Sequence, residues 1–295
     1  MLMPVSRDNL QDRATGSNAL GPTSAASLSD SEATKFFWTK RLRTHGHTGW
    51  ADWVVYSYDQ LERLALVETV LREHRIQAGK ALDFGCGTGD FSRLLLKMGF
   101  HVCGYDPFVK PTIRSKRFHY APSYVDIPFE DSTVDLVLSV TVLAHIHHND
   151  AVRDALAIIS DQLRVGGALC LVEYALDSSL DRERYSLKNE YQSFRTLEEW
   201  TELLASASFG VLDVIPVAQP IINPSQGYLA YSRDPLTRLC RRIPDNLLAR
   251  LVCAPMLRHR AAKYVERVGS GVTRRIGSSP LKLIRAYKTE GKAGS

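Results

Sequence analysis

Residues 81–91 read Ala-Leu-Asp-Phe-Gly-Cys-Gly-Thr-Gly-Asp-Phe. An apolar run ends there in three alternating glycines, Gly85, Gly87 and Gly89, and an amphipathic helical pattern follows at once. Glycines at this spacing remove the Cβ atoms from a turn between a strand and a helix, so the backbone can bend sharply and approach a ligand closely. The free N–H groups at the start of the helix point to the same place. The stretch therefore predicts a ligand-binding turn in an α/β fold.

Three interpretations of this turn compete. A dinucleotide-binding turn requires Gly-x-Gly-x-x-Gly, with a pyrophosphate on the helix N-terminus. Here the third glycine comes one residue early, and Asp90 stands where the last glycine should be, so its carboxylate would repel a pyrophosphate. The spacing Asp83-x-Gly85-x-Gly87-x-Gly89 instead resembles motif I of class I S-adenosylmethionine-dependent methyltransferases, whose cofactor carries no phosphate. The third interpretation is a tight turn in an unrelated α/β protein.

An acidic residue ends the next predicted strand. Residues 102–106 read Val-Cys-Gly-Tyr-Asp and follow the glycines at the distance expected for one helix and one strand. A carboxylate at this place can accept both ribose hydroxyls of an adenosine. The methyltransferase resemblance implies this role for Asp106, whereas a lone aspartate after a strand is otherwise a common turn former.

A third passage extends the resemblance. Residues 124–131, Tyr-Val-Asp-Ile-Pro-Phe-Glu-Asp, lead into a β-rich apolar run at 134–146, which is typical of a central parallel strand covered on both faces. The passage is similar to the D-x-P-F-x-D and F-D-L-V-x-S motifs of the same family. The resemblance implies that Asp126 lies at the adenine amino group, that Ile127 packs beside the ring, and that backbone near Ser139 receives the methionine end.

The alternation of strand and helix patterns predicts an α/β fold. We expect a doubly wound, mostly parallel, seven-stranded sheet with N-terminal helices and a helical insertion before the last strand. The connection 108–120 contains Pro111 and little helical periodicity, so the helix usual in the family is not expected there. The expected strands are 80–84, 101–105, 122–125, 134–140, 168–174, 211–217 and 281–288, and the expected helices are 31–44, 58–75, 89–98, 149–164 and one that begins after Thr196.

Five segments are predicted along the chain. Residues 1–32 are rich in small and polar residues and are expected to be a disordered leader. A helical cap at 33–76 precedes the S-adenosylmethionine-binding core at 77–217, which is followed by a basic helical insertion at 218–280 and by a final strand and tail at 281–295. Because segments before the first strand often cover the ligand in this family, the resemblance suggests that role for three side chains of the cap, which are Tyr56, Tyr58 and Arg63.

The segment 218–280 carries eleven lysines and arginines against three acidic residues, although the net charge of the whole chain is only +5. Three interpretations stay open. The segment is a solvated surface whose arginines lie over apolar neighbours, a lid that grips an anionic substrate, or an attachment to an anionic membrane or nucleic acid. Aromatic residues do not alternate with the basic ones, which disfavours a nucleic-acid partner that binds by stacking.

Composition places limits on the protein class. Hydrophobic residues make up 44% and charged residues 23% of the 295 residues, as in ordinary globular proteins. No apolar stretch is long enough to span a bilayer, and the N-terminus lacks the apolar core of a secretory signal. The five cysteines form no C-x-x-C pair, which favours reduced thiols and a cytoplasmic protein. The oligomeric state does not follow from the sequence.

Candidate catalytic residues should lie just past the strands that hold the cofactor. Methyl transfer requires positioning, and it requires a base where the acceptor must lose a proton. His145, His147 and His148 follow the fourth expected strand, and histidine suits proton removal from a hydroxyl. Glu173, at the end of the fifth, could hydrogen-bond the acceptor. No metal site is expected, because the histidines have no acidic or cysteine partner nearby. His145, His148 and Glu173 are the predicted catalytic set.

These observations predict methyl transfer from S-adenosylmethionine to a small molecule, such as a sugar, a glycan precursor or a natural-product intermediate. Residues 139–142 lack the Pro-Pro-aromatic motif of enzymes that methylate nucleic-acid amino groups, and the chain has no Pro-Cys dipeptide of the cytosine C5 type. The clustered histidines favour oxygen over nitrogen as the methyl acceptor. The alternatives are an RNA methyltransferase that uses the basic insertion, an inactive binding protein with this fold, and an NAD-dependent oxidoreductase.

Overall fold

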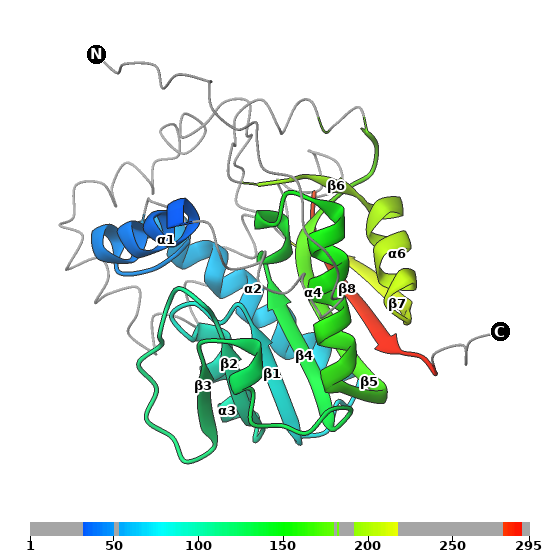
Figure 1. Cartoon of the computed structure of the whole chain (residues 1–295), viewed down its shortest axis with the longest axis horizontal. Helices are drawn as coiled ribbons and strands as arrows, with labels where there is room; N and C mark the ends of the chain where they lie inside the picture. The colour runs from blue at the N-terminus through cyan, green and yellow to red at the C-terminus, as the bar shows by residue number, and fades with distance from the viewer. Residues whose placement is uncertain (1–31, 50–52, 180–181, 183–191, 218–279, 291–295) are drawn as a thin grey trace, which may run out of the picture.

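The computed structural model describes residues 32–49, 53–179, 182, 192–217 and 280–290. The predicted leader at 1–32, apart from its last residue, and the basic insertion at 218–280, apart from its last residue, lie outside these residues. Figure 1 shows the described part as a twisted sheet with helices on both faces. Among the described residues, no helix is long and apolar enough to cross a membrane.

The sheet has the predicted architecture. Seven strands lie in the order β3-β2-β1-β4-β5-β8-β7, and a short strand β6 pairs with β5 beside this path. Every pairing among β1 to β5 is parallel, and β8 runs antiparallel to both β5 and β7. The doubly wound, mostly parallel fold is therefore confirmed. The strands are β1 (Lys80–Phe84), β2 (His101–Tyr105), β3 (Phe118–Ala121), β4 (Val134–Val140), β5 (Leu163–Leu176), β6 (Arg195–Thr196), β7 (Phe209–Pro216) and β8 (Leu281–Lys288).

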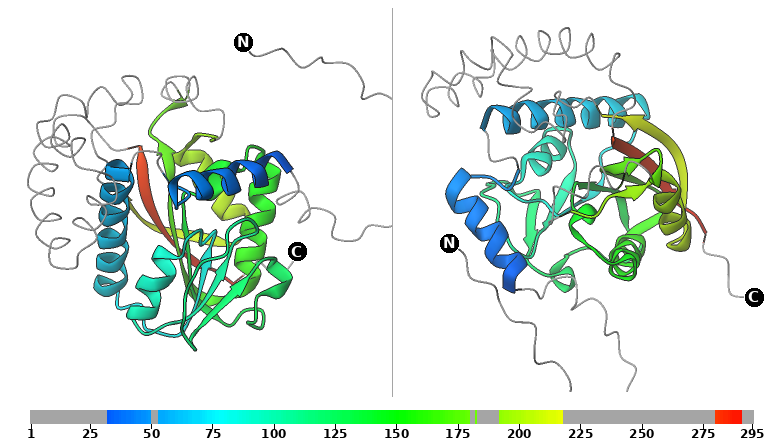
Figure 2. Two further views of the ribbon diagram at one scale, coloured as in Figure 1. Left: turned by 90° about the vertical axis from the view of Figure 1, so that its left-hand side faces the viewer. Right: turned by 90° about the horizontal axis from the view of Figure 1, so that it is seen from above.

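Helices cover both faces of the sheet, as the two turned views show (Figure 2). Apolar residues of α2 and α3 pack on one face, and those of α4 and α6 pack on the other. Helix α1 precedes α2 and lies near the carboxyl ends of the strands (Figure 1). The helices are α1 (Glu32–His45), α2 (Trp53–Glu73), α3 (Asp90–Lys97), α4 (Asn149–Gln162) and α6 (Leu197–Ser206), with short 3-10 helices η2 (Tyr124–Asp126) and η3 (Leu143–His145).

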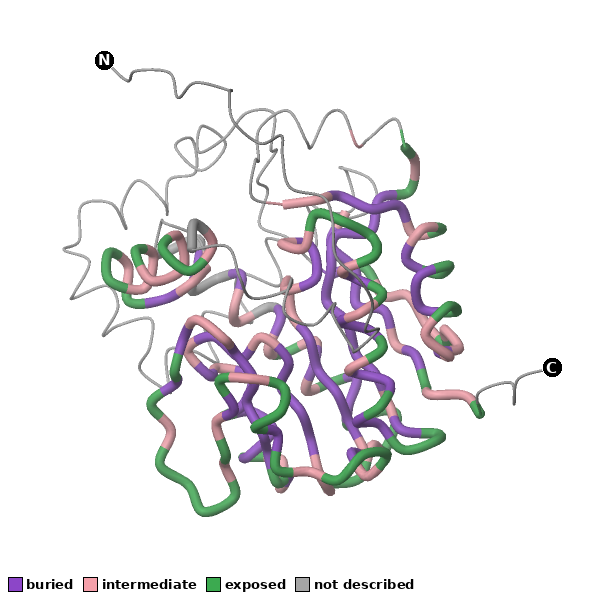
Figure 3. The backbone as a smooth tube through the Cα atoms, in the orientation of Figure 1, coloured by how far each residue is buried: buried purple, intermediate pink, exposed green. Residues whose placement is uncertain are grey.

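The central strands are mostly buried (Figure 3), because helices cover them from both sides, and residues 164–166 near the start of β5 are exposed. Strand β4 illustrates this point, since Leu136, Val137 and Leu138 are all fully buried although they point alternately to the two faces. The described cysteines, Cys86, Cys103 and Cys170, are buried free thiols. The buried sheet therefore holds the carboxyl ends of the parallel strands in fixed positions.

One predicted strand was misplaced. A strand was expected at 122–125, but β3 ends at Ala121 and a 3-10 turn occupies 124–126. The shift has a physical reason, because the register pairs Tyr105 at the end of β2 with Ala121, and Pro122 has no N–H to continue the ladder. No helix lies between β2 and β3, as predicted from the composition of 108–120.

Helix α6 begins with a reciprocal capping box. The Thr196 hydroxyl accepts a hydrogen bond from the Glu199 backbone N–H at 3.2 Å, and the Glu199 carboxylate accepts one from the Thr196 N–H at 2.8 Å. Two backbone donors that the helix leaves unpaired are thus satisfied. The sequence predicted this start from Thr196 and the acidic residues behind it.

We expect Thr196→Ala to lower the free energy of unfolding by about 1 kcal/mol, because it removes the cap. The control is Thr201→Ala in the same helix, where the hydroxyl only bonds back to the Leu197 carbonyl and alanine is the better helix former. Urea unfolding measures both variants. Equal destabilisation by the two would contradict a capping role for Thr196.

Candidate active site

The glycine turn joins β1 to α3 with the geometry that its spacing predicts. Gly85, Gly87 and Gly89 have φ angles of 77°, 50° and 84°, in the left-handed region where a side chain is strained. A Cβ on Gly85 would lie 2.2 Å from a methyl group of Val142, which follows β4. The turn can therefore pack against the end of β4 only because this residue lacks a side chain.

Asp83 links the two elements on either side of the turn. It is buried in β1, and its carboxyl accepts a 2.6 Å hydrogen bond from the Ser92 hydroxyl of α3. Burial raises the pKa of Asp83 to about 7, although the bond from Ser92 opposes that shift. The residue ties the first strand to the helix that follows the turn.

Asp106 follows β2 and bonds to two loops at once. Its Oδ2 accepts a hydrogen bond from the Gly87 N–H at 3.0 Å, and its Oδ1 accepts bonds from the N–H groups of Phe108 and Val109, both at 2.8 Å. Burial raises the pKa of the carboxyl, and these three N–H groups act in the opposite direction. Each oxygen of a carboxylate can accept about two bonds, so acceptor capacity remains for a ligand.

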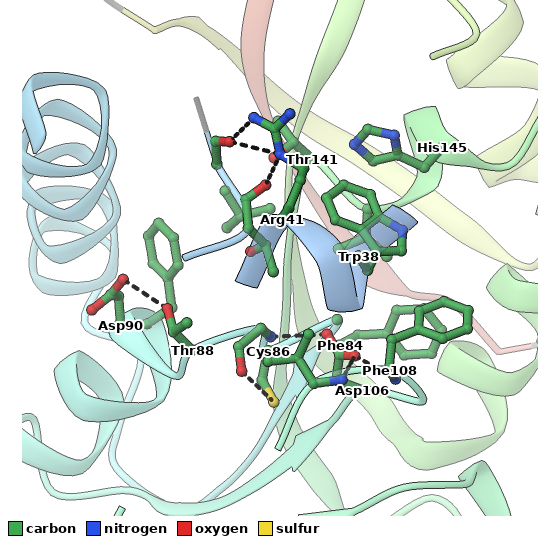
Figure 4. Close-up of a pocket in the computed structure, with 18 of the residues that line it drawn as sticks. Trp38, Arg41, Phe84, Cys86, Thr88, Asp90, Asp106, Phe108, Thr141 and His145 are labelled. Atoms are coloured by element: carbon green, nitrogen blue, oxygen red, sulfur yellow. Dashed lines mark hydrogen bonds between the residues drawn. The ribbon is translucent and has the colours of Figure 1, made fainter. Parts of the chain in front are cut away.

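A cavity of about 470 Å³ opens above this turn (Figure 4). Its walls come from α1, α2, the glycine turn, the loop after β2 and the segment after β4. In the close-up, Asp106 and Phe108 lie on the side of the turn, whereas Trp38 and His145 lie across the cavity from them. One hollow therefore brings together four of the residues predicted for cofactor binding, Asp83, Gly85, Gly87 and Asp106, and one of the predicted catalytic histidines.

The N-terminal cap closes one side of the cavity. Arg41 of α1 donates hydrogen bonds to the carbonyls of Thr48 and Gly49, which fixes the loop after the helix. In that loop His47 stacks on Tyr56 of α2 with ring centroids 3.6 Å apart. The Tyr56 hydroxyl in turn donates a 2.8 Å bond to Asp90 at the start of α3. The cap is thereby joined to the glycine turn.

Arg63, a residue predicted to cover the ligand, is a buried cation in the cavity wall. Its guanidinium forms a two-pronged ion pair with Asp59, with N–O distances of 3.0 and 2.6 Å. It also donates a 3.0 Å bond to the hydroxyl of Thr141. Thr141 follows β4 with φ +52°, a conformation that costs a non-glycine residue energy and that clusters at functional sites. The side chain of Tyr58, the third candidate, lies outside the described residues.

The predicted catalytic residues lie in three different places. His145 lines the cavity, and its ring meets the edge of Trp38 at a centroid distance of 4.7 Å and an angle of 88°. His147 and His148 are exposed and line a second cavity of about 410 Å³ next to α4. Glu173 is fully buried and, among the described residues, does not line the larger cavity. Its carboxylate accepts hydrogen bonds from the backbone N–H groups that follow β4.

Only some of the residues predicted to bind the cofactor line the cavity. Gly85, Gly87, Asp83 and Asp106 line the cavity. Gly89 lies just below as the N-cap of α3. Asp126 is exposed, whereas Ile127 is buried in the core. Ser139 is buried, and Val140 and Thr141 after it line the cavity in its place. The structure thus brings together the glycine turn, Asp83 and Asp106, and it leaves Asp126 and Ser139 outside the described lining.

Sequence reasoning missed several residues of the wall. Trp38 and Arg41 come from α1, and Phe108 comes from the loop after β2. The mixture of aromatic and basic residues before the first strand was a signal for the first two, but no spacing rule connects them with a turn that lies more than forty positions away in the sequence.

The methyltransferase-domain family matches residues 57–214, which is more than half of the chain. The chain belongs to this methyltransferase family. The match confirms the resemblance to class I S-adenosylmethionine-dependent methyltransferases that the motifs suggested.

Proteins similar to this methyltransferase in sequence or in fold are named for different methyl acceptors. It is 30% identical over 183 residues to a ubiquinone biosynthesis O-methyltransferase of Methylobacterium nodulans, a match that covers 54% of this chain and 70% of the relative. Its fold is similar to that of a 1,6-didemethyltoxoflavin-N1-methyltransferase of Burkholderia thailandensis (TM-score 0.51, 18% identity, 94% of each chain covered). A phosphoethanolamine N-methyltransferase of Haemonchus contortus gives a TM-score of 0.51 at 17% identity, with 86% of this chain and 60% of that chain covered.

The cavity of the methyltransferase fits S-adenosylmethionine by its own chemistry. Its volume lies in the range of small-molecule sites. Gly85, Gly87 and the buried Asp106 all line it, and Oδ2 of Asp106 can accept one more hydrogen bond. Four aspartates line the hollow, and one of them, Asp59, is paired with Arg63. The other three, Asp83, Asp90 and Asp106, suit a cationic sulfonium and oppose a pyrophosphate.

The cap of the methyltransferase should be sensitive to acid through His47. Burial, helped by the nearby cations His45 and Arg41, lowers the pKa of His47 from 6.5 to about 4. The unfolded chain then binds a proton more readily than the folded one, so stability is complete above pH 6.5 and falls as the pH drops towards 4. From pH 7 to pH 5 the expected loss is roughly 2 kcal/mol. His47→Phe keeps a ring on Tyr56 and should remove this loss, as measured by urea unfolding at both pH values.

The control is His101→Phe, because His101 is exposed at the start of β2. This variant should lose the same stability on acidification as the unmodified protein does. If His47→Phe were as acid-sensitive as the unmodified protein, the stacked histidine would not be the titrating group.

Proposed function

We propose that this methyltransferase transfers a methyl group from S-adenosylmethionine to a hydroxyl group of a small molecule. One observation carries the proposal. The cavity that Gly85, Gly87 and Asp106 line at one side is also lined by Trp38 and His145 at the other. A cofactor seated on the glycine turn and an acceptor beside His145 would therefore share one enclosed space.

The residues of the turn would hold the cofactor. Asp106 would accept a ribose hydroxyl on Oδ2, the oxygen that receives only one backbone N–H, and the backbone at Gly85 and Gly87 allows close approach. The guanidinium of Arg63 is buried and is held in place by Asp59, so it can face the methionine carboxylate. When bound, S-adenosylmethionine supplies an electrophilic methyl group. The cap formed by α1 covers one side of this space and would limit the access of water, which would strengthen these interactions.

The acceptor side of the cavity has a different character. Phe37, Trp38, Ile146 and Tyr174 provide apolar and aromatic walls, and His145 adds a proton acceptor. Such walls favour a flat, largely apolar acceptor, which supports a natural-product intermediate more than a sugar. A neutral imidazole in this position would take the proton that a hydroxyl loses on methylation. This supports oxygen as the methyl acceptor.

The comparisons support the chemistry more than the atom that is methylated. The relative from Methylobacterium nodulans is named as an O-methyltransferase. The two similar structures are named as N-methyltransferases, and both were solved with S-adenosylhomocysteine. We therefore base the preference for oxygen on His145 and its surroundings.

Asp106→Ala should weaken S-adenosylmethionine binding by about tenfold to a hundredfold, since hydrogen bonds to a charged group contribute about 1.5–3 kcal/mol. Titration calorimetry measures this effect. Asp150→Ala at the exposed start of α4 is the control and should bind as the unmodified protein does. Absence of binding to the unmodified protein would end the proposal. Asp126→Ala tests the adenine contact that the resemblance implies.

His145→Phe should lower methyl transfer by about 10²–10⁴-fold, the usual contribution of a general base, and leave cofactor affinity unchanged. Phenylalanine keeps the ring contact with Trp38. The assay incubates the protein with S-adenosylmethionine labelled in the methyl group and the small-molecule fraction of a cell extract, and it detects labelled products by mass spectrometry. His101→Phe, far from the cavity, is the control. Undiminished transfer by His145→Phe would exclude a base at this position.

A further inference from the structure

The segment after β4, residues 141–147, contributes part of the cavity wall, and His145 belongs to it. Thr141, Val142, His145 and Ile146 all line the cavity. Apart from the single 3-10 turn η3, the segment has no regular structure. Its backbone N–H and C=O groups are partly buried and therefore need partners from elsewhere in the fold.

Glu173 binds backbone N–H groups of this segment. Its Oε1 accepts hydrogen bonds from the N–H groups of Val142 and Leu143 at 2.9 and 2.8 Å, and its Oε2 accepts one from Ala144 at 3.3 Å. The side chain belongs to β5, a central strand, and it is fully buried. A carboxylate that receives three N–H groups at the start of η3 fixes the direction in which the segment leaves the sheet.

Arg195 binds backbone carbonyl groups of the same segment. Its guanidinium donates hydrogen bonds to the carbonyls of Leu143, Ile146 and His147 at 3.3, 2.7 and 3.4 Å. Its Nε donates a further bond to the Asn149 side chain at 2.9 Å. Only 3% of Arg195 is exposed, and its guanidinium lies over the ring of Trp200 at 5.4 Å. A planar fork with several donors suits this task, which a lysine could not reproduce.

The two side chains are buried charges of opposite sign on either side of one segment. Burial raises the pKa of Glu173 to about 7, while the three N–H groups and the charge of Arg195 oppose the shift. Burial likewise lowers the pKa of Arg195, and the charges of Glu173 and Glu199 oppose that change. Buried charges are costly unless hydrogen bonds satisfy them. Here the partners are the backbone groups of a cavity wall.

We propose that Glu173 and Arg195 are positioning residues, which clamp the segment 141–147 from its N–H and carbonyl sides and so hold His145 towards the acceptor. Neither side chain lines the cavity itself in the described part of the chain. The inference rests on the proposed function, because it takes the acceptor to lie beside His145. It gives Glu173 an indirect role in place of the direct contact that the sequence suggested.

Glu173→Gln is the central test. Glutamine has the same shape, but one acceptor oxygen becomes an NH₂ group that faces backbone donors. We expect hydrogen exchange of the Val142–Ala144 amides to be at least tenfold faster, kcat to fall about tenfold to a hundredfold, and the Kd for S-adenosylmethionine to change less than twofold. Arg195→Lys should produce the same pattern, since it retains the charge and loses the fork. Exchange is followed by mass spectrometry, and kcat with the acceptor found in the extract screen.

Asp135→Asn is the matched control. Asp135 also accepts a backbone N–H, from Lys80, and pairs with Arg164, but it does so near the amino end of β4, whereas the segment 141–147 follows the carboxyl end of that strand. This variant should leave exchange in 141–147 and kcat unchanged, whatever it does to the melting temperature. Asn149→Ala is a milder variant at an exposed position and loosens one bond of Arg195. It should give a smaller change of the same kind even if the central variants do not fold.

The outcomes separate the two proposals. If Glu173→Gln and Arg195→Lys lower only the melting temperature, with exchange and kcat unchanged, or if Asn149→Ala leaves both unchanged where the central variants do not fold, the clamp is wrong. If the unmodified protein transfers no methyl group, the proposed function fails, and the exchange measurement still decides whether the two residues hold the segment. Faster exchange with unchanged kcat would overturn the positioning role.

Discussion

The Asp106 carboxylate is the constraint on which the site depends. It accepts an N–H from the glycine turn with one oxygen and two N–H groups from the loop after β2 with the other. The first and second strands of the sheet thus end in loops that share one buried acid. Because β1 and β2 are paired over their full length, the position of this acid relative to Gly87 is fixed by the sheet. A ligand that binds the carboxylate therefore meets the bare turn at the same time.

Further contacts hold the N-terminal cap and the segment after β4 against the glycine turn. Asp90 at the start of α3 receives the Tyr56 hydroxyl, and Tyr56 supports His47 in the loop after α1. On the opposite side, Gly85 leaves room for Val142, so the segment after β4 can lie against the turn. The cap and the acceptor wall are thus both positioned from the same few residues of the turn.

Features of the fold that neighbouring residues determine were predictable from the sequence. Features that depend on contacts between residues far apart in the sequence were not. Strands β1 and β2 have the predicted bounds, because their apolar runs end in Gly85 and Asp106. The start of α6 followed from the capping pattern at Thr196. Strand β3 was misplaced because its register depends on pairing with β2, and the one local signal for its end, Pro122, was not used. Trp38 and Glu173 illustrate the same limit for the site, since the roles of these side chains depend on contacts across the fold.

Charge explains why a glycine turn of this kind serves a sulfonium cofactor and not a dinucleotide. Asp83, Asp90 and Asp106 all line the cavity, and burial disfavours the ionised forms of Asp83 and Asp106. A pyrophosphate would add negative charge beside these groups, in a space where water screens poorly, and the repulsion would oppose its binding. A sulfonium brings a positive charge to the same space and stabilises the ionised carboxyls. The glycines allow both kinds of ligand to approach, and the acids around them decide between the two.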